Sequence, residues 1–281
     1  MKIFKSAKSV QNYILSLKRQ GRRIGFVPTM GCLHDGHLSL IKRARKDNDV
    51  VVLSIFINPI QFGPNEDYKH YPRSLKMDLM LARNGGVDVV YYPDSREMYT
   101  EDHCTYVEVN GISEVLCGEF RPGHFKGVTT VCAKLFNIVQ PDIVYLGKKD
   151  YQQAIIIKQM VKNLNMPLRI KIVPIVREKD GLAISSRNRN LTKGNRKQAL
   201  VIFKSLQTVR GLVKDGVKDT GKIKSKVENI ISNMPGIKVE YIRVVDLKLL
   251  QPVAVIKKPV LLAIVVWIKK VRLIDNIILK P

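Results

Sequence analysis

Apolar residues in the first two thirds of the chain follow helical and strand-like spacings in turn. Val10, Ile14 and Leu17 recur at intervals of three or four, which predicts an amphipathic helix. Ile24–Thr29 and Val50–Ile57 are largely unbroken apolar runs, which predicts two buried strands. A glycine-containing loop follows the first of these strands and leads into a second helix.

The same alternation continues to about residue 176. Helices that alternate with unbroken apolar strands indicate a parallel sheet, so the predicted class is α/β: a Rossmann-like parallel sheet with helices on both faces. The remaining predicted helices of this part are Leu38–Ala44, Pro72–Asn84, Pro122–Val139 and Asp150–Leu164, and the remaining strands are Val87–Tyr91, Thr105–Val109, Ile143–Leu146 and Ile170–Val176.

The pattern changes after Arg177. A polar loop precedes two helical stretches and three strand-like runs with short connections, which predicts a smaller C-terminal α+β domain with antiparallel strands. We therefore expect two domains, 1–176 and 177–281. The elements of the second domain are the loop Glu178–Asn190, helices Lys193–Val213 and Lys222–Asn233, and strands Val239–Val245, Val260–Trp267 and Val271–Leu279.

Composition adds a strong basic excess to this picture. The 281 residues include 48 Lys plus Arg and 24 Asp plus Glu, a formal charge of +24, and 45% are hydrophobic. Disorder and collagen are excluded. The charge could mark a nucleic-acid surface, attract a polyanionic substrate or have no role. Because the lysines are scattered without interleaved aromatic residues, we expect no nucleic-acid partner.

No membrane or export signal is expected. The longest apolar run, Pro259–Ile268, is about half of what a spanning helix needs. Residues 1–34 hold basic but no acidic side chains, as transit peptides do, but the strand from Ile24 leaves no room for a leader. The cysteines lack CxxC or zinc spacing, so we expect reduced thiols in a cytoplasmic protein. They are Cys32, Cys104, Cys117 and Cys132.

Two histidines stand where the first core strand turns into a helix. His34 and His37 flank Gly36, and a helix N-terminus offers N–H groups and partial positive charge to a phosphate. Histidine N–H donors there could stabilise charge that develops on a phosphoryl group. The alternative is a helix cap and a surface residue, but the HxGH spacing at a strand-to-helix turn favours function.

Two further segments follow core strands. Asn58 and Gln61 follow the second strand, and their amides can orient a small polyfunctional acid, although the segment could equally be a simple turn. Gly147–Asp150 follows Ile143–Leu146: its lysines can meet phosphate, and Asp150 can cap a helix or bind ribose. Gln153 shares that site only if the strands are close in the sheet.

Two loops complete the candidates. Ser185, Ser186 and Arg187 can neutralise a pyrophosphate leaving group, and by themselves they would more often form a solvated loop. Arg121 and His124, beside a proline at a predicted helix start, could line a site, a subunit contact or a structural turn.

Six ordered motifs carry a family resemblance. HxGH and the serine loop are typical of the nucleotidyltransferase superfamily. The chain more specifically resembles the pantoate–β-alanine ligase (pantothenate synthetase) family, from about residue 24 to residue 276. The motifs are FVPTMGxLHDGHLSLI, FxNPxQFGPNEDYxxYPR, RPGHFxGV, GxKDYQQ, REKDGLAxSSRN and RLIDN.

The resemblance implies ATP-dependent condensation of (R)-pantoate with β-alanine through a pantoyl adenylate, with release of AMP and pyrophosphate. It implies that His37 donates a proton with help from His34, that Gln61, Gln153 and Asn58 hold substrate, and that the second domain is lid-like. The catalytic set would be His37, His34, Lys149, Ser185, Ser186 and Arg187. The ATP-binding set would be Met30, Gly31, Cys32, Leu33, His34, Asp35, Gly36, His37, Gly147, Lys148, Lys149, Asp150, Val176, Ile184, Ser185, Ser186 and Arg187.

The resemblance also implies a cytoplasmic homodimer. Mg²⁺ would arrive with ATP, since no protein-built metal site is evident. Ile60, Lys148 and Asn190 depart from the usual family residues, but none replaces a group expected to act. Two rivals stay open: another adenylate-forming enzyme of the same fold, and a nucleic-acid-binding protein whose HxGH no longer acts.

Overall fold

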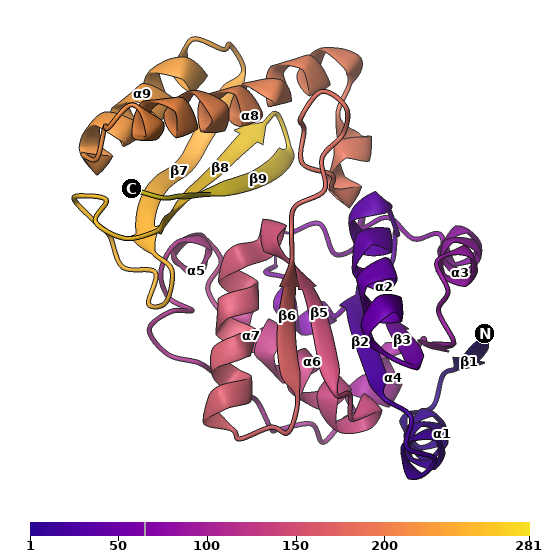
Figure 1. Ribbon diagram of the computed structural model, residues 1–281. Coiled ribbons are helices and arrows are strands. Elements are labelled where there is room, and N and C mark those ends of the chain that lie inside the picture. The colour runs from indigo at the N-terminus through magenta and orange to yellow at the C-terminus, as the bar shows by residue number, and fades with distance from the viewer. Residues whose placement is uncertain (65) are drawn as a thin grey trace. The chain divides into compact units, whose positions relative to one another are not determined.

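The computed structural model describes residues 1–64 and 66–281, and the chain divides into two units, Met1–Pro174 and Ile175–Pro281 (Figure 1). The first unit is built on a six-stranded sheet in the order β1-β4-β3-β2-β5-β6, and every pairing is parallel. The predicted α/β class is therefore confirmed. The strands are β1 (Lys2–Phe4), β2 (Ile24–Thr29), β3 (Val50–Ile55), β4 (Val89–Tyr91), β5 (Ile143–Gly147) and β6 (Arg169–Val173).

Helices cover both faces of this sheet (Figure 1). Ile41 of α2 and Ala82 of α3 pack in one core with Val27 of β2. The next residue of β2 toward the N-terminus, Phe26, points to the other face and meets Phe136 of α6 edge to face, with ring centroids 6.3 Å apart. The helical segments are α1 (Ala7–Arg19), α2 (Asp35–Asp47), α3 (Leu75–Asn84), α4 (Ser95–Met98), α5 (Cys117–Phe120), α6 (His124–Val139) and α7 (Tyr151–Asn163), with short 3₁₀ turns η1 (Pro59–Gln61) and η2 (Lys148–Asp150).

The strand predicted at Thr105–Val109 is wrong. This segment is irregular, and the backbone of Val107 at its centre bonds side chains of α6 instead of a neighbouring strand. Val107 N–H donates to Thr130 Oγ1 at 3.0 Å, and Thr129 Oγ1 donates to the carbonyl of Val107. Val107 therefore has a helix as its partner, which the spacing of apolar residues alone could not reveal.

Several predicted boundaries also move. The helix predicted from Pro122 begins at His124, because Gly123 takes a left-handed conformation with φ of +78° at the N-cap. The helix predicted from Pro72 begins at Leu75, after Ser74. The strand predicted through Val176 ends at Val173, since Pro174 has no N–H to continue the ladder.

The second unit places two long helices on a three-stranded antiparallel sheet ordered β7-β8-β9. Ile202 and Leu206 of α8 and Ile223 of α9 share a core with Leu262 and Ile264 of β8. This confirms the predicted α+β pattern. The elements are η3 (Ser186–Asn190), α8 (Lys193–Lys214), α9 (Thr220–Ser232), β7 (Ile237–Asp246), β8 (Val260–Ile268) and β9 (Val271–Leu279). Across the described residues of both units, no helix combines the length and apolar character that a bilayer span requires.

Candidate active site

Three of the chemistry-bearing segments follow adjacent strands. The loop with His34 and His37 follows β2, the segment with Gln61 follows β3, and Lys148–Asp150 follows β5. Because β2 lies between β3 and β5, these three segments meet at one edge of the sheet. From β2 the chain adds β3 and β4 on one side, and it then adds β5 and β6 on the other side. The strand order therefore reverses between β2 and β5, and open α/β sheets bind ligands at such a switch point.

His34 and His37 lie side by side at the start of α2. Their ring centroids are 4.0 Å apart and the ring planes differ by 28°. Gly36 makes room for this stack, because a Cβ there would lie 2.9 Å from Cε1 of His34. His34 occupies the N-cap position but its side chain makes no capping bond. The alternative interpretation of His34 as a helix cap is therefore wrong.

His37 is held in its neutral form. Burial, together with the charges of His34 and Lys149, lowers its pKa to about 3. Its Nδ1 is buried and has no hydrogen-bond partner among the described residues. Since β5 neighbours β2, the segment with Lys149 lies at the same edge of the sheet as His37. A bound anion would raise this pKa again.

The loop before α2 is held by Asp78, a buried carboxylate of α3. It accepts the N–H groups of Cys32 and Leu33 at 2.9 and 2.7 Å, while Thr29 Oγ1 accepts the N–H of Gly31 at 3.1 Å. These N–H groups are therefore already used. The first-turn N–H groups of α2 have no acceptor within the helix, so they are the ones that an anion could bind.

Asp78 was not among the residues predicted from the sequence. One signal was available: Asp78 lies three residues after Leu75 and four before Ala82, on the stripe that the helix buries. An acid on a buried helical stripe needs donors, and here they are backbone N–H groups of a neighbouring loop.

Gln61 contacts the loop between β2 and α2. It is buried, its Nε2 contacts Met30 Sδ at 3.2 Å, and its Oε1 accepts from Asn58 Nδ2 at 3.1 Å. Asn58 also donates to the carbonyl of Gly127 at 3.0 Å and accepts from Tyr99 at 2.7 Å. Both amide protons of Asn58 are thus committed, so its contact with Gln61 orients the Gln61 side chain.

The glutamine pair at the start of α7 divides between two environments. Gln152 is buried and donates to the carbonyls of Ile112 and Val115, so it fixes the preceding loop. Gln153 is only partly buried. Asp150 makes no capping bond with its side chain, which leaves the expected cap unformed. Because β5 neighbours β2, the start of α7 does lie at the same sheet edge as His37.

The serine loop belongs to the second unit. Val176 accepts the N–H of Ile184 at 3.1 Å, and Arg177 pairs with Ala183, so the loop begins as a tight hairpin. Ser185 accepts the N–H of Arg187 at 3.3 Å, and Ser186 is buried. By themselves these residues would more often form a solvated loop, whereas here Ser186 is buried and backbone hydrogen bonds anchor the loop.

The anchor of this loop is a carboxylate near the end of the chain. Asp275 of β9 accepts two hydrogen bonds from Arg177, at 2.6 and 2.9 Å, and Asp275 is 4% exposed. The guanidinium of Arg177 also lies 4.7 Å from the ring centre of Phe203. The RLIDN motif, which had no assigned role, thus holds the start of the REKDG segment.

Metal-ligand groups and disulfide bonds are the remaining chemistry considered from the sequence. The described part of the chain contains no group of three or more His, Cys, Asp or Glu side chains that could hold a metal ion. None of the four cysteines forms a disulfide bond within it.

A Rossmann-like sheet with paired histidines at its switch point defines an enzyme of the nucleotidyltransferase class. The family model described as pantoate-beta-alanine ligase matches residues 2–278, and the chain belongs to this family. The activity expected from the sequence, ligation of pantoate to β-alanine with ATP, is thereby confirmed.

Individual relatives agree over the full length. The chain is 49% identical over 280 residues to the pantothenate synthetase of Moorella thermoacetica, with 100% of this chain and 99% of that protein covered. A crystal structure of pantothenate synthetase from Thermus thermophilus matches with a TM-score of 0.95 and 39% identity over 100% of both chains. The Francisella tularensis ligase, complexed with beta-gamma ATP and beta-alanine, matches with a TM-score of 0.81 and 38% identity, over 99% of this chain and 97% of that one.

Proposed function

We propose that the reaction proceeds in two steps at the carboxyl edge of the six-stranded sheet. The pantoate carboxylate attacks the α-phosphorus of ATP, which forms pantoyl adenylate and releases pyrophosphate. The β-alanine amine then attacks the acyl carbon, and pantothenate and AMP leave. The observation that carries this proposal is the His34–His37 stack, which lies at the same edge of the sheet as the segment with Lys149.

His37 and Lys149 stabilise the first transition state. Negative charge grows on the phosphoryl oxygens and on the departing pyrophosphate, and donors aimed at it lower the barrier. His37 is neutral in the free enzyme and offers an N–H hydrogen bond; once bound ATP raises its pKa, His37 can take up a proton and then donate that proton. His34 assists through the stacked contact.

ATP is held mainly by backbone and cationic groups. The first turn of α2 provides N–H groups for phosphate, and Asp150 provides a carboxylate for the ribose. Ser185, Ser186 and Arg187 bind the pyrophosphate as it leaves. The full proposed set is Met30, Gly31, Cys32, Leu33, His34, Asp35, Gly36, His37, Gly147, Lys148, Lys149, Asp150, Val176, Ile184, Ser185, Ser186 and Arg187.

Pantoate is bound by Gln61 and Gln153, with Asn58 acting on Gln61. The amide of Gln61 is buried beside Met30, and Gln153 opens the neighbouring helix. Amides suit this substrate because they can donate to a carboxylate and accept from its hydroxyl groups.

Mg²⁺ enters with the triphosphate. Since the described residues form no three-carboxylate or histidine cluster, the ion would take most of its ligands from phosphate and water. It would neutralise charge on the phosphates. We further propose a homodimer in the cytoplasm, in which residues 177–281 act as a lid.

Isotope exchange tests the two-step order. With ATP, Mg²⁺ and pantoate but no β-alanine, labelled pyrophosphate should be incorporated into ATP, because the first step is reversible and needs no amine. Exchange that requires β-alanine would contradict a free pantoyl adenylate step, and exchange that is indifferent to pantoate would contradict the assigned acid.

A further inference from the structure

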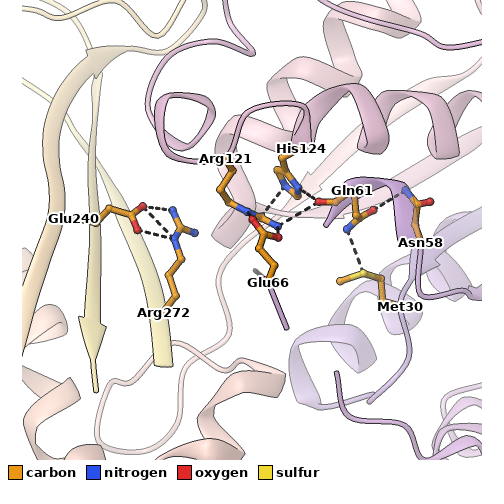
Figure 2. A network of polar contacts seen from close by, with 8 residues as sticks. All are labelled: Met30, Asn58, Gln61, Glu66, Arg121, His124, Glu240 and Arg272. Atoms are coloured by element: carbon orange, nitrogen blue, oxygen red, sulfur yellow. Dashed lines mark hydrogen bonds and ion pairs between the residues drawn. The ribbon is translucent and has the colours of Figure 1, made fainter. Parts of the chain in front are cut away.

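Arg121, Glu66 and His124 form a polar cluster against the backbone of Gln61 (Figure 2). Arg121 Nε donates to Glu66 Oε1 at 2.7 Å, and its Nη2 pairs with the other carboxylate oxygen. Arg121 Nη1 lies 3.0 Å from His124 Nε2, and His124 Nδ1 lies 2.8 Å from the carbonyl oxygen of Gln61. Arg121 Nη2 reaches the same carbonyl at 3.4 Å.

These contacts fix the tautomer of His124. A carbonyl oxygen only accepts hydrogen bonds, so Nδ1 of His124 must carry the proton that it donates to Gln61. A guanidinium only donates, so Nε2 must accept from Arg121. In this arrangement His124 bridges the Arg121 guanidinium and the backbone carbonyl of Gln61.

The Arg121–Glu66 pair is itself well held. Its side chains are only 14% and 25% exposed, and the pair makes two parallel hydrogen bonds. Burial alone would raise the pKa of Glu66, but the hydrogen bond and charge of Arg121, together with His124 and the backbone of Gly63, lower it overall. The carboxylate stays ionised and keeps the guanidinium in place.

The backbone of α6 also packs closely against the turn η1, which contains Gln61. A Cβ at Gly127 would lie 2.5 Å from the carbonyl oxygen of Ile60 and 2.6 Å from Cα of Gln61. Only glycine allows so close an approach. Gly127 also accepts the Asn58 hydrogen bond, so both ends of the turn at Gln61 are tied to α6.

We propose that Arg121, His124 and Glu66 are positioning residues for pantoate, which act by fixing the main chain of Gln61. This inference rests on the proposed role of Gln61 as a pantoate ligand. The cluster touches the carbonyl of Gln61 and leaves its side-chain amide to Met30, Asn58 and the substrate. Loss of the cluster therefore misplaces the amide of Gln61 first, because the hydrogen bonds of the cluster end on the Gln61 carbonyl and not on the histidines or lysines proposed to bind ATP. A shift of about 1 Å in such a group can cost on the order of 10² in rate.

Steady-state kinetics of three His124 variants test the role of this bridge. His124→Ala should raise the KM for pantoate about tenfold or more, with the KM for ATP within about threefold of wild type. His124→Asn should restore most of the loss, because its Nδ2 lies where Nδ1 of histidine lies and can donate to Gln61. His124→Gln places its amide at the Nε2 position and should not.

Two outcomes would overturn the proposal. One is equal behaviour of the Asn and Gln variants, and the other is a parallel rise of both KM values. If the His124 variants fail to fold, Arg121→Lys tests the proposal instead. The single amine of lysine can pair with Glu66 but cannot also reach His124 and Gln61. It should raise the pantoate KM, and an unchanged value would refute the cluster's role.

Gln61→Ala, measured alongside, separates this inference from the proposed function. A large rise in pantoate KM there, with normal values for Arg121 and His124 variants, defeats only the positioning cluster. A normal pantoate KM for Gln61→Ala instead defeats the assignment of Gln61 itself.

Discussion

Among single residues, both the position of His37 in the HxGH motif and its surroundings indicate a role at the phosphates. Its ring is stacked on His34, its Nδ1 is buried, and the charge of Lys149 contributes to its lowered pKa. The HxGH spacing could be found from the sequence. The lowered pKa could not, because it depends on burial and on a lysine more than a hundred positions away.

Replacement of His37 by alanine should lower the turnover number by about 10² or more, since one transition-state donor is lost. AMP release at saturating substrates measures this, and circular dichroism checks that the variant folds. His70→Ala is the matched control, because His70 is exposed and lies outside the proposed site. Near-normal turnover in a folded His37→Ala enzyme would show that His37 is not the donor.

The lowered pKa of His37 also makes stability depend on pH. Between about 3 and about 6.5 the unfolded chain binds a proton at His37 that the folded chain does not, so stability falls as pH drops below about 6.5. His37→Gln lacks this effect. Urea unfolding should therefore show the wild type losing on the order of 1 kcal/mol relative to His37→Gln between pH 7 and pH 5. A difference that stays constant with pH would mean that His37 is not held neutral.

At the scale of elements, the loop between β2 and α2 depends on α3. Sequence patterns located the strand, the loop and the helix, but not the carboxylate that joins them, because Asp78 lies far along the chain from Cys32. The same limitation explains the missing strand at Thr105–Val109, where side chains of α6 bond the backbone of Val107.

Asp78→Ala should loosen this loop. It leaves two buried N–H groups without acceptors, which typically costs about 1–3 kcal/mol each, and it should raise the KM for ATP about tenfold. Thermal unfolding and ATP kinetics measure the two effects. Asp94→Ala is the control, because Asp94 caps α4 at an exposed position. Equal changes in ATP KM for both variants would argue against a specific role of Asp78.

Arg177 and Asp275 connect the two ends of the second unit. Removal of one partner of a buried ion pair typically costs about 3–5 kcal/mol, so Asp275→Ala should destabilise the protein strongly. It should also raise the KM for ATP, because the serine loop loses its anchor. Asp275→Asn, which keeps an acceptor oxygen, should recover part of both losses.

Glu240→Ala provides a matched control in the same sheet. Glu240 forms a comparably buried pair with Arg272, whose side chain points to the opposite face of β9 from that of Asp275. It should lower the unfolding temperature as Asp275→Ala does but leave the KM for ATP unchanged. A similar rise in ATP KM for both variants would show that general destabilisation, not loop position, sets ATP affinity.

For the whole molecule, strand order is the feature that the sequence could not provide. The motifs at His37, Gln61 and Lys149 were each assigned to a strand end, but only the order β3-β2-β5 brings these ends together. Periodicity reports burial along the chain and carries no information on which parallel strands are neighbours. The net charge of +24 is equally a whole-molecule property, and it suits a polyanionic substrate such as ATP.

The most direct test of the account is AMP formation by the purified protein, with ATP, Mg²⁺, pantoate and β-alanine present and each omitted in turn. We expect steady AMP release only in the complete mixture, with pantothenate formed in equal amount and no change when nucleic acid is added. A folded protein that binds ATP but releases no AMP in the complete mixture would contradict the ligase assignment.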